Sequence, residues 1–255
     1  MNYAGIDLGS RFIKLALVDE NATSIHLAQV DTGFDPLNAA CGLLENTKYD
    51  YLLATGYGRE LLEIENDSPT ITEIRAHARG AAASFPGASA VVDIGGQDSK
   101  VISIDEKGRV RKFEMNDRCA AGTGKFLEMM AKTLNFEMED FGDEALKAET
   151  EIRLSSMCTV FAESEVISVI AKGGDRRSIA KGVHMSVVDR ISGMLSRTAP
   201  NGDIVFTGGV ASNSCMQKLL AERTSRKILV SDKPQFTGAL GAALIALEKN
   251  KIEQK

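Results

Sequence analysis

Short apolar stretches that end in aspartate or glycine recur along the first half of the chain. Tyr3–Asp7 is apolar and runs into Leu-Gly-Ser, and Phe12–Val18 alternates apolar with polar residues, as a strand with one buried face does. The same patterns predict further strands at Ile25–Val30, Tyr51–Ala54, Ala90–Asp93, Lys100–Ile104 and Val110–Glu114. The acidic stretch Glu63–Pro69 is interpreted as a run of turns.

Helical spacing of apolar residues appears between these strands and dominates the second half. Asp35 and Asp175 stand where an N-cap residue is favoured. The helices predicted are Pro36–Glu45, Ile71–Ser84, Gly124–Leu134, Asp140–Ala148, Val160–Ala171, the segment from Asp175 to Thr198, Ser212–Arg223 and residues 238–255. Two more strands are expected, at Ile204–Phe206 and Lys227–Val230. Strands joined by helices in this way indicate an α/β protein.

Two segments of the first half match position for position. Ile6–Asp19 reads IDLGSRFIKLALVD and Val92–Asp105 reads VDIGGQDSKVISID. Each begins with Asp-x-Gly, has a lysine at the same offset (Lys14 and Lys100), alternates apolar residues and closes on Asp. This repetition predicts two related lobes. We expect a first lobe over residues 1–88, closed by the C-terminal helix 238–255, and a second lobe over residues 89–237.

Composition narrows the class of protein. The 255 residues are 44% hydrophobic and 25% charged, as in an ordinary globular chain that can bury a sizeable core. A net charge of -5 argues against nucleic acid or an anionic membrane as partner. No apolar run approaches the ~20 residues that span a bilayer. No secretory signal is recognised at the N-terminus, so a cytoplasmic location is expected.

An aspartate at a strand end, followed by a glycine turn, suits a phosphate site. The glycines let backbone N–H groups approach an anion, and the carboxylate can orient Mg²⁺ through its water shell. The two hairpins after Asp7 and Asp93 have this form. Thr207–Val210, with Ser212-Asn213 after it, is a third glycine loop, on which an adenosine could lie. Each element alone is more often an ordinary strand turn, but all three in this order favour a nucleotide site.

The four cysteines are Cys41, Cys119, Cys158 and Cys215, and no C-x-x-C pair occurs. Cys119 and Cys158 each stand shortly before a predicted helix, whose N-terminus stabilises thiolate and an anionic cluster. A cubane cluster normally needs four thiolates, so a symmetric dimer with two per chain could hold one. Buried core thiols are the competing interpretation of this pair. Cys41 and Cys215 are interpreted as core or helix residues.

Nearly the whole chain resembles the activator ATPases of (R)-2-hydroxyacyl-CoA dehydratases and benzoyl-CoA reductases, within the superfamily of actin, sugar kinases and heat-shock chaperones. The cysteine segments are the specific part of this resemblance, because sugar kinases and chaperones share the phosphate loops without the cysteine pair. The segments that carry it are GIDLGS (Gly5–Ser10), LATGYGR (Leu53–Arg59), VVDIGGQDSKVI (Val91–Ile102), MNDRCAAGTGKFLE (Met115–Glu128), CTVFAESEVIS (Cys158–Ser168), TGGVASN (Thr207–Asn213) and QFTGALGAAL (Gln235–Leu244).

The resemblance implies an actin-like (ribonuclease H-like), duplicated, two-lobed ATPase fold and a homodimer. It implies that Cys119 and Cys158 from each of two subunits bind one bridging [4Fe-4S] cluster. A ferredoxin or flavodoxin would reduce this cluster. ATP, Mg²⁺ and lobe movement would then drive one electron onto an iron–sulfur acceptor such as a dehydratase or reductase.

The expected site residues follow the matched motifs. Asp7, Asp93 and Gln97 are the candidate catalytic residues, with the two aspartates organising Mg²⁺ and water. The candidate nucleotide residues are Gly9, Ser10, Arg11, Lys14, Gly95, Gly96, Gln97, Asp98 and Lys125 around the phosphates and Gly208, Gly209, Val210, Asn213 and Gln235 around the adenosine. Arg11 departs from the family, which usually has a small hydroxylated residue there. It either contacts phosphate or points away.

Lys125 belongs to Gly-Thr-Gly-Lys, which fails as a Walker A motif because Cys119 stands where the first glycine is needed and Phe126 follows the lysine. Lys125 either reaches the nucleotide or is a solvated surface lysine. Two other functions compete with electron transfer: a small-molecule (sugar) kinase of the same superfamily, and a nucleotide-dependent regulatory module without enzymatic activity. The sequence lacks an evident sugar-binding insertion or chaperone substrate domain, which argues against both.

Overall fold

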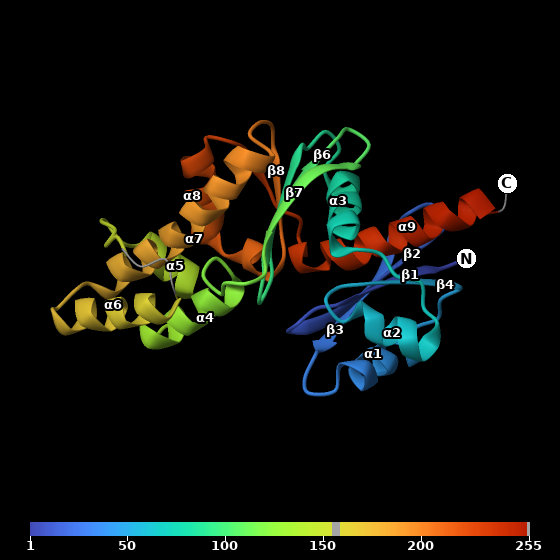
Figure 1. The fold of residues 1–255 in the computed structure, drawn as a ribbon, viewed down its shortest axis with the longest axis horizontal. Helices are drawn as coiled ribbons and strands as arrows, with labels where there is room; N and C mark the ends of the chain where they lie inside the picture. The colour runs from blue at the N-terminus through green and yellow to red at the C-terminus, as the bar shows by residue number, and fades with distance from the viewer. Residues whose placement is uncertain (155–158, 254–255) are drawn as a thin grey trace. The chain divides into compact units, whose positions relative to one another are not determined.

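The computed structural model describes residues 1–154 and 159–253 (Figure 1). The chain divides into two compact units, which we call unit 1 and unit 2. Unit 1 comprises Met1–Ala88, Ile104–Arg111 and Ser231–Lys255, and unit 2 comprises Ser89–Ser103 and Lys112–Val230. None of the helices in the described ranges is long and apolar enough to cross a membrane.

The sheet of unit 1 is built around β1, which pairs antiparallel with β2 and parallel with β4. Its strands are, in spatial order, β3 (Ser24–Asp31), β2 (Phe12–Val18), β1 (Tyr3–Leu8) and β4 (Tyr51–Thr55). Side chains alternate between the two faces. Ile6 and Leu8 belong to one apolar cluster with Leu44 and Leu62, whereas Tyr3 belongs to another with residues of the last helix.

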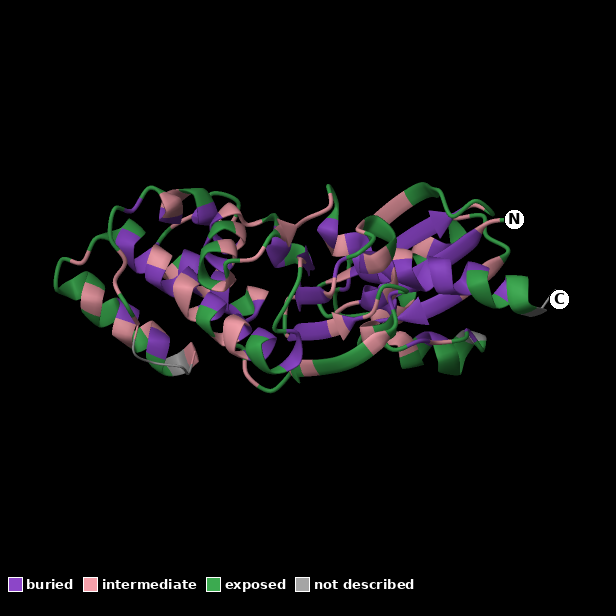
Figure 2. Cartoon of the chain, turned by 90° about the horizontal axis from the view of Figure 1, so that it is seen from above, coloured by how far each residue is buried: buried purple, intermediate pink, exposed green. Residues whose placement is uncertain are grey.

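Four helices belong to unit 1: α1 (Pro36–Glu45), α2 (Arg59–Asn66), α3 (Glu73–Ser84) and α9 (Thr237–Glu253). α9 packs on β1, β2 and β4 and alongside α3, whereas α1 packs on β2 and β3 and α2 packs on β4. Figure 2 shows the buried residues gathered along these strands and the exposed end of α9 beside the C-terminus. Both faces of the sheet are therefore covered.

The second sheet repeats the plan of the first. Its order is β7 (Val110–Asn116), β6 (Ser99–Ile104), β5 (Ala90–Ile94), β8 (Ile204–Thr207) and β9 (Ile228–Leu229). β5 pairs antiparallel with β6 and parallel with β8, as β1 does with β2 and β4. The predicted duplicated α/β fold is confirmed by this shared topology.

The helices of unit 2 are α4 (Gly124–Thr133), α5 (Phe141–Leu146), α6 (Thr159–Ala171), α7 (Arg176–Thr198) and α8 (Ser214–Thr224), with a 3-10 turn, η1 (Gly209–Ser212), between β8 and α8. The long α7 contacts α4, α5, α6 and α8. Its N-cap is Asp175, whose side chain accepts a hydrogen bond from the Ser178 N–H, as predicted. Its predicted inner face, from Ile179 to Leu195, is buried.

Three sequence-based expectations for the elements need correction. Glu63–Pro69 is not wholly a turn, because α2 occupies Arg59–Asn66. α8 does not begin at Ser212: Asn213 is its N-cap and accepts a 2.9 Å hydrogen bond from the Met216 N–H. The last helix begins at Thr237, directly after the 3-10 turn η2 (Pro234–Phe236), rather than at 238.

Candidate functional site

The first Asp-x-Gly hairpin places a buried carboxylate beside a lysine. Asp7 at the end of β1 stands opposite Lys14 of β2 in the ladder, and Lys14 Nζ lies 3.1 Å from Asp7 Oδ2. The two side chains are only 9% and 14% exposed, so this ion pair is poorly screened by water. Antiparallel pairing at this offset explains why the repeated Asp and Lys recur together.

Two glycines give the Asp7 carboxylate its space. Gly56 has φ +97°, a left-handed conformation that favours glycine, and a Cβ there would lie 2.5 Å from Asp7 Oδ1. A Cβ on Gly238 would lie 3.3 Å from Asp7 Oδ2 and 2.8 Å from Nε2 of His77. The motifs LATGYGR and QFTGALGAAL, quoted above without a structural role, thus meet at this carboxylate.

A buried hydroxyl lies at the same strand ends. Thr55 pairs with Asp7 in the parallel β1–β4 ladder and is fully buried. Its Oγ1 has no hydrogen-bond partner among the residues that the structure describes. A buried polar atom left without a partner is costly, which makes this the kind of place where a bound water, ion or ligand atom is expected. Thr55 and His77 were not predicted as site residues, because their proximity to Asp7 depends on contacts between β1, β4, α3 and α9 rather than on the Asp-x-Gly pattern.

The second hairpin carries a more enclosed charge cluster. Lys100 Nζ lies 3.4 Å from Asp93 Oδ2 and 2.6 Å from Asp98 Oδ2, and its side chain is 3% exposed. Thr207 at the end of β8 donates a 3.0 Å hydrogen bond from Oγ1 to Asp93 Oδ1. The Asp93 carboxylate is therefore oriented from two sides, as a carboxylate that positions a metal's water must be.

The third glycine loop lies beside that aspartate. Gly208 has φ +84°, and a Cβ there would lie 2.8 Å from Asp93 Oδ1. Gly209 is exposed, and a Cβ on it would meet no described atom within 4 Å. Val210 is buried, while a ligand could lie flat over Gly209. Asp93, Gly208 and Gly209 are brought together within unit 2 by the parallel pairing of β5 with β8.

The helix after Cys119 rests directly on the second hairpin. Its first two N–H groups, from Gly124 and Lys125, donate 2.9 Å hydrogen bonds to the carbonyls of Gly95 and Gly96. A Cβ on Gly124 would lie 3.0 Å from the Gly95 carbonyl oxygen and 3.2 Å from Val210 Cγ2. Two of the N–H groups that a helix leaves unpaired at its start are thus satisfied by the second hairpin.

Cys119 lies in a turn held from within. Asn116 Nδ2 donates to the carbonyls of Cys119, at 2.9 Å, and of Ala121, at 3.1 Å. Cys119 is partly exposed and forms no disulfide with another described residue. It lies in this turn and not at the helix cap, which is Thr123. Cys158, its predicted partner, falls outside the described residues. In the described ranges no group of three His, Cys, Asp or Glu residues could hold a metal ion.

Several other predicted nucleotide residues lie at the surface. Ser10, Arg11 and Gln97 are exposed, and the Arg11 guanidinium stands 5.6 Å from the centre of the Phe12 ring. The Lys125 side chain is 62% exposed, with Nζ 3.4 Å from Glu128 Oε2. The described contacts of Lys125 with the second hairpin are therefore made by its backbone.

The two adenosine candidates with polar side chains differ in their surroundings. Asn213 caps α8 with Oδ1 and pairs Nδ2 with His184 Nε2 at 3.0 Å, so both ends of its amide are engaged. Burial of His184 lowers its pKa to about 4, which keeps the ring neutral and able to accept from Asn213. Gln235 lies in η2 of unit 1 and is half-buried.

Cysteines outside the predicted pair do not resemble ligands. Cys215 is fully buried in α8, and burial raises the pKa of its thiol to about 12. Cys41 is half-buried in α1. Both are helix residues, as expected.

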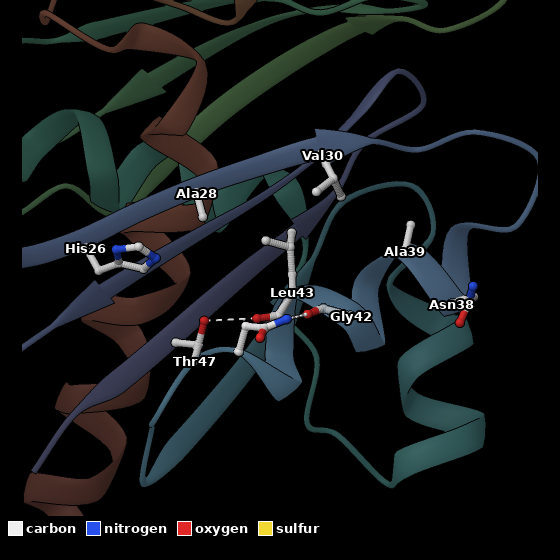
Figure 3. A pocket seen from close by; sticks show the side chains of 9 residues that line it. His26, Ala28, Val30, Asn38, Ala39, Gly42, Leu43 and Thr47 are labelled. Atoms are coloured by element: carbon white, nitrogen blue, oxygen red, sulfur yellow. Dashed lines mark hydrogen bonds between the residues drawn. The ribbon is translucent and has the colours of Figure 1, made fainter.

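A groove of about 400 Å³ lies elsewhere in unit 1, between β3 and α1 (Figure 3). Ala28, Val30, Ala39 and Leu43 form its apolar side. Asn46 Nδ2 and Thr47 Oγ1 at its rim donate to carbonyls of α1 itself, those of Gly42 and Leu43. In the described structure none of the predicted nucleotide residues lines this groove.

The duplicated sheets and the paired Asp–Lys hairpins define an actin-like ATPase. More specifically, the chain belongs to the BadF/BadG/BcrA/BcrD ATPase family, whose sequence profile matches residues 4–246. The resemblance inferred from the motifs is thereby confirmed, and so is the prediction of an enzyme of the ATPase class.

Three relatives illustrate this relationship. The activator of lactoyl-CoA dehydratase from Anaerotignum propionicum is 41% identical over 253 residues, 96% of either chain. The crystal structure of component A of the (R)-2-hydroxyglutaryl-CoA dehydratase from Acidaminococcus fermentans has a TM-score of 0.91 at 39% identity, over 98% of this chain and 99% of that one. The activator of the 2-hydroxyisocaproyl-CoA dehydratase from Clostridium difficile, with bound ADPNP, has a TM-score of 0.90 at 36% identity, over 100% and 97%.

The similarity to sugar kinases is much weaker. A ROK family glucokinase from Streptomyces griseus has a TM-score of 0.63 at 13% identity, over 97% of this chain and 100% of that one. At that level of identity only the fold is shared.

Proposed function

We propose that this chain is an ATP-dependent donor of single low-potential electrons. In this proposal it binds ATP with Mg²⁺, forms a homodimer around one [4Fe-4S] cluster, and activates an iron–sulfur enzyme such as a 2-hydroxyacyl-CoA dehydratase or benzoyl-CoA reductase. The observation that carries it is the pair of hydrogen bonds by which the second hairpin holds the helix that follows Cys119. Membership of the ATPase family and the names of the relatives support the same function.

The residues of the two hairpins fit a nucleotide and its Mg²⁺. Asp7 and Asp93 are buried carboxylates at strand ends, and each is held by a lysine. Carboxylates of this kind bind Mg²⁺ or the waters around it. Gly96 and Gln97 offer backbone and amide donors to phosphate oxygens, whereas the Gly95 N–H donates to the Asp98 carbonyl and closes the loop. Gly208 and Gly209 leave a surface for the adenosine. Hydrolysis would then depend on positioning and charge stabilisation.

Cys119 is suited to a ligand role shared between chains. It is a partly exposed thiol in a turn held by Asn116, and one such thiol cannot complete a cluster site. With Cys158 and the same pair from a second chain, four thiolates become available. A cluster held there would supply the electron, which it loses as the acceptor enzyme gains it; a ferredoxin or flavodoxin would restore it.

The surface of α6, the helix after Cys158, suits a second chain. Phe161, Ile167 and Ile170 are exposed, Phe161 by 68%. Ile167 and Ile170 are three residues apart and share one face of the helix, which is suited to burial in an assembly, whereas Phe161 lies on another face. Burial against the same helix of another copy would bring the two cysteine segments toward one axis.

Anaerobic reconstitution with iron and sulfide tests the cluster. We expect a dimer with about four iron atoms, and we expect Cys119→Ser and Cys158→Ser to lose them. Cys41→Ser is the matched control and should keep its iron. A colourless monomer after reconstitution, or full iron in both variants, would overturn the proposed function. Phosphorylation of a sugar by that monomer would establish the kinase alternative.

A further inference from the structure

We infer that His77 is a positioning residue of the ATPase site, which holds the Asp7 carboxylate toward Mg²⁺ and the attacking water. This inference rests on the proposed function and assigns a role to a buried histidine that the phosphate loops do not include. His77 is 5% exposed and lies in α3, far along the chain from both glycine hairpins.

Close helix packing fixes where His77 stands. A Cβ on Gly241 of α9 would collide with the Ala76 carbonyl of α3, and a Cβ on Gly80 of α3 would collide with the Thr237 carbonyl of α9. The two helices are therefore in backbone contact on both sides of His77. A helix held at this separation has little freedom to slide, so the imidazole position is determined by packing.

The imidazole and the Asp7 carboxylate share one small space. Both lie beside Gly238, since a Cβ on that glycine would lie 2.8 Å from His77 Nε2 and 3.3 Å from Asp7 Oδ2. Asp7 Oδ2 is also the oxygen that Lys14 approaches at 3.1 Å. A hydrogen on Nε2 would therefore make His77 a second donor on the Lys14 side of Asp7.

The other oxygen of the Asp7 carboxylate, Oδ1, has different neighbours. Asp7 Oδ1 lies against Gly56, next to the buried Thr55, whose Oγ1 has no partner in the part of the chain that the structure describes. Lys14 contacts Oδ2, and His77 lies on the same side of the carboxylate, beside Gly238, so Oδ1 and Thr55 Oγ1 are the oxygens that a metal-bound water would meet. Loss of a side chain that hydrogen-bonds a metal ligand typically costs about 10- to 100-fold in metal affinity or activity.

Isothermal titration of ADP, with Mg²⁺ and with EDTA, measures this role without turnover. His77→Leu removes the donor at similar size, and His77→Gln can place an amide N–H near the position of Nε2. The quantity compared is the factor by which Mg²⁺ raises the affinity for ADP. We expect this factor to be at least about tenfold smaller in His77→Leu than in the wild type, and close to the wild-type value in His77→Gln. ADP affinity in EDTA should stay near that of the wild type in both. In turnover with Mg²⁺, kcat of His77→Leu should fall and its KM for ATP should rise, whereas His77→Gln should stay near the wild type in both.

His26→Leu, at an exposed histidine of the same unit, is the matched control and should behave as the wild type. An unchanged Mg²⁺ effect in a folded His77→Leu protein would overturn the inference. Equal loss in His77→Gln and His77→Leu would also overturn it, because volume rather than the donor would then matter. A wild-type protein that binds no ADP at all would instead contradict the proposed function.

Discussion

The N–H of Gly124 donates a 2.9 Å hydrogen bond to the carbonyl of Gly95, which joins the first turn of α4 to the second Asp-x-Gly hairpin. The neighbouring bond, from Lys125 to Gly96, makes the connection two-point. A rigid two-point contact transmits rotation as well as displacement. If nucleotide shifts the hairpin, the turn that carries Cys119 must shift with it. The link runs through the backbone, whereas the Lys125 side chain pairs with Glu128.

Gly124→Val tests this link. A Cβ at Gly124 already lies 3.0 Å from the Gly95 oxygen, so the branched side chain must push α4 off the hairpin. We expect ATP-dependent electron transfer to fall by about tenfold or more, because small misplacements at such sites are costly. ADP affinity, measured by titration, should change much less. Lys125→Met separates the alternatives: a loss as large as that in Gly124→Val would mean that the side chain carries the link.

Lys100→Met should destabilise unit 2 strongly. It removes the cation between Asp93 and Asp98 and leaves a buried carboxylate without its partner. Breaking a buried pair in this way costs about 3–5 kcal/mol of unfolding free energy. Chemical unfolding at neutral pH measures the loss. Lys14→Met should cost less unfolding free energy, because it leaves only the Asp7 carboxylate without its lysine and that pair is more exposed. A larger loss in Lys14→Met than in Lys100→Met would contradict this prediction.

His184 should make stability depend on pH. Its pKa is about 4 in the folded protein, below the ordinary value of 6.5, because the ring is buried. Between pH 6.5 and pH 4 the His184 ring therefore binds a proton in the unfolded chain but not in the folded chain. Stability is lost as pH falls through this window, by about 2 kcal/mol between pH 7 and pH 5. His184→Gln should have a correspondingly smaller loss over the same interval, and an equal loss would contradict this account.

Gly42→Ala should stabilise the protein. Gly42 lies within α1, and a Cβ on it would meet no described atom within 4 Å. Alanine in a helix interior is favoured over glycine by about 0.5–1 kcal/mol. Thermal unfolding should show a higher midpoint. Gly5→Ala is the opposite case, since its Cβ would collide with the backbone of Ala239 and Ala243 and should lower the midpoint.

The hairpins could be predicted because their signal is local. Asp7 with Lys14, and Asp93 with Lys100, are repeated at one offset, and antiparallel pairing of adjacent strands brings each pair together. Asp175 was predictable for the same reason, because a cap and its helix are neighbours in sequence.

The missed features depend on contacts that sequence spacing does not show. α2 was missed because its acidic residues resemble a turn and only Leu62 of its apolar residues is buried, while Leu61 and Ile64 are exposed. His77 was missed because Asp7 and Gly238, its neighbours in space, belong to other elements. Asn213 stays a prediction as a nucleotide residue; what its motif did not show is that its amide caps α8 and pairs with His184.

The most direct test of the proposed electron donor is its ATP dependence. The reconstituted protein is reduced, freed of reductant, and mixed anaerobically with the lactoyl-CoA dehydratase whose activator in Anaerotignum propionicum is 41% identical to this chain. Stopped-flow spectra then record the oxidation of the donor and the reduction of the dehydratase. We predict one electron per dimer with ATP and Mg²⁺, and no transfer without nucleotide or with ADPNP. Transfer at the same rate without ATP, or ATP hydrolysis with no electron transferred, would contradict the account.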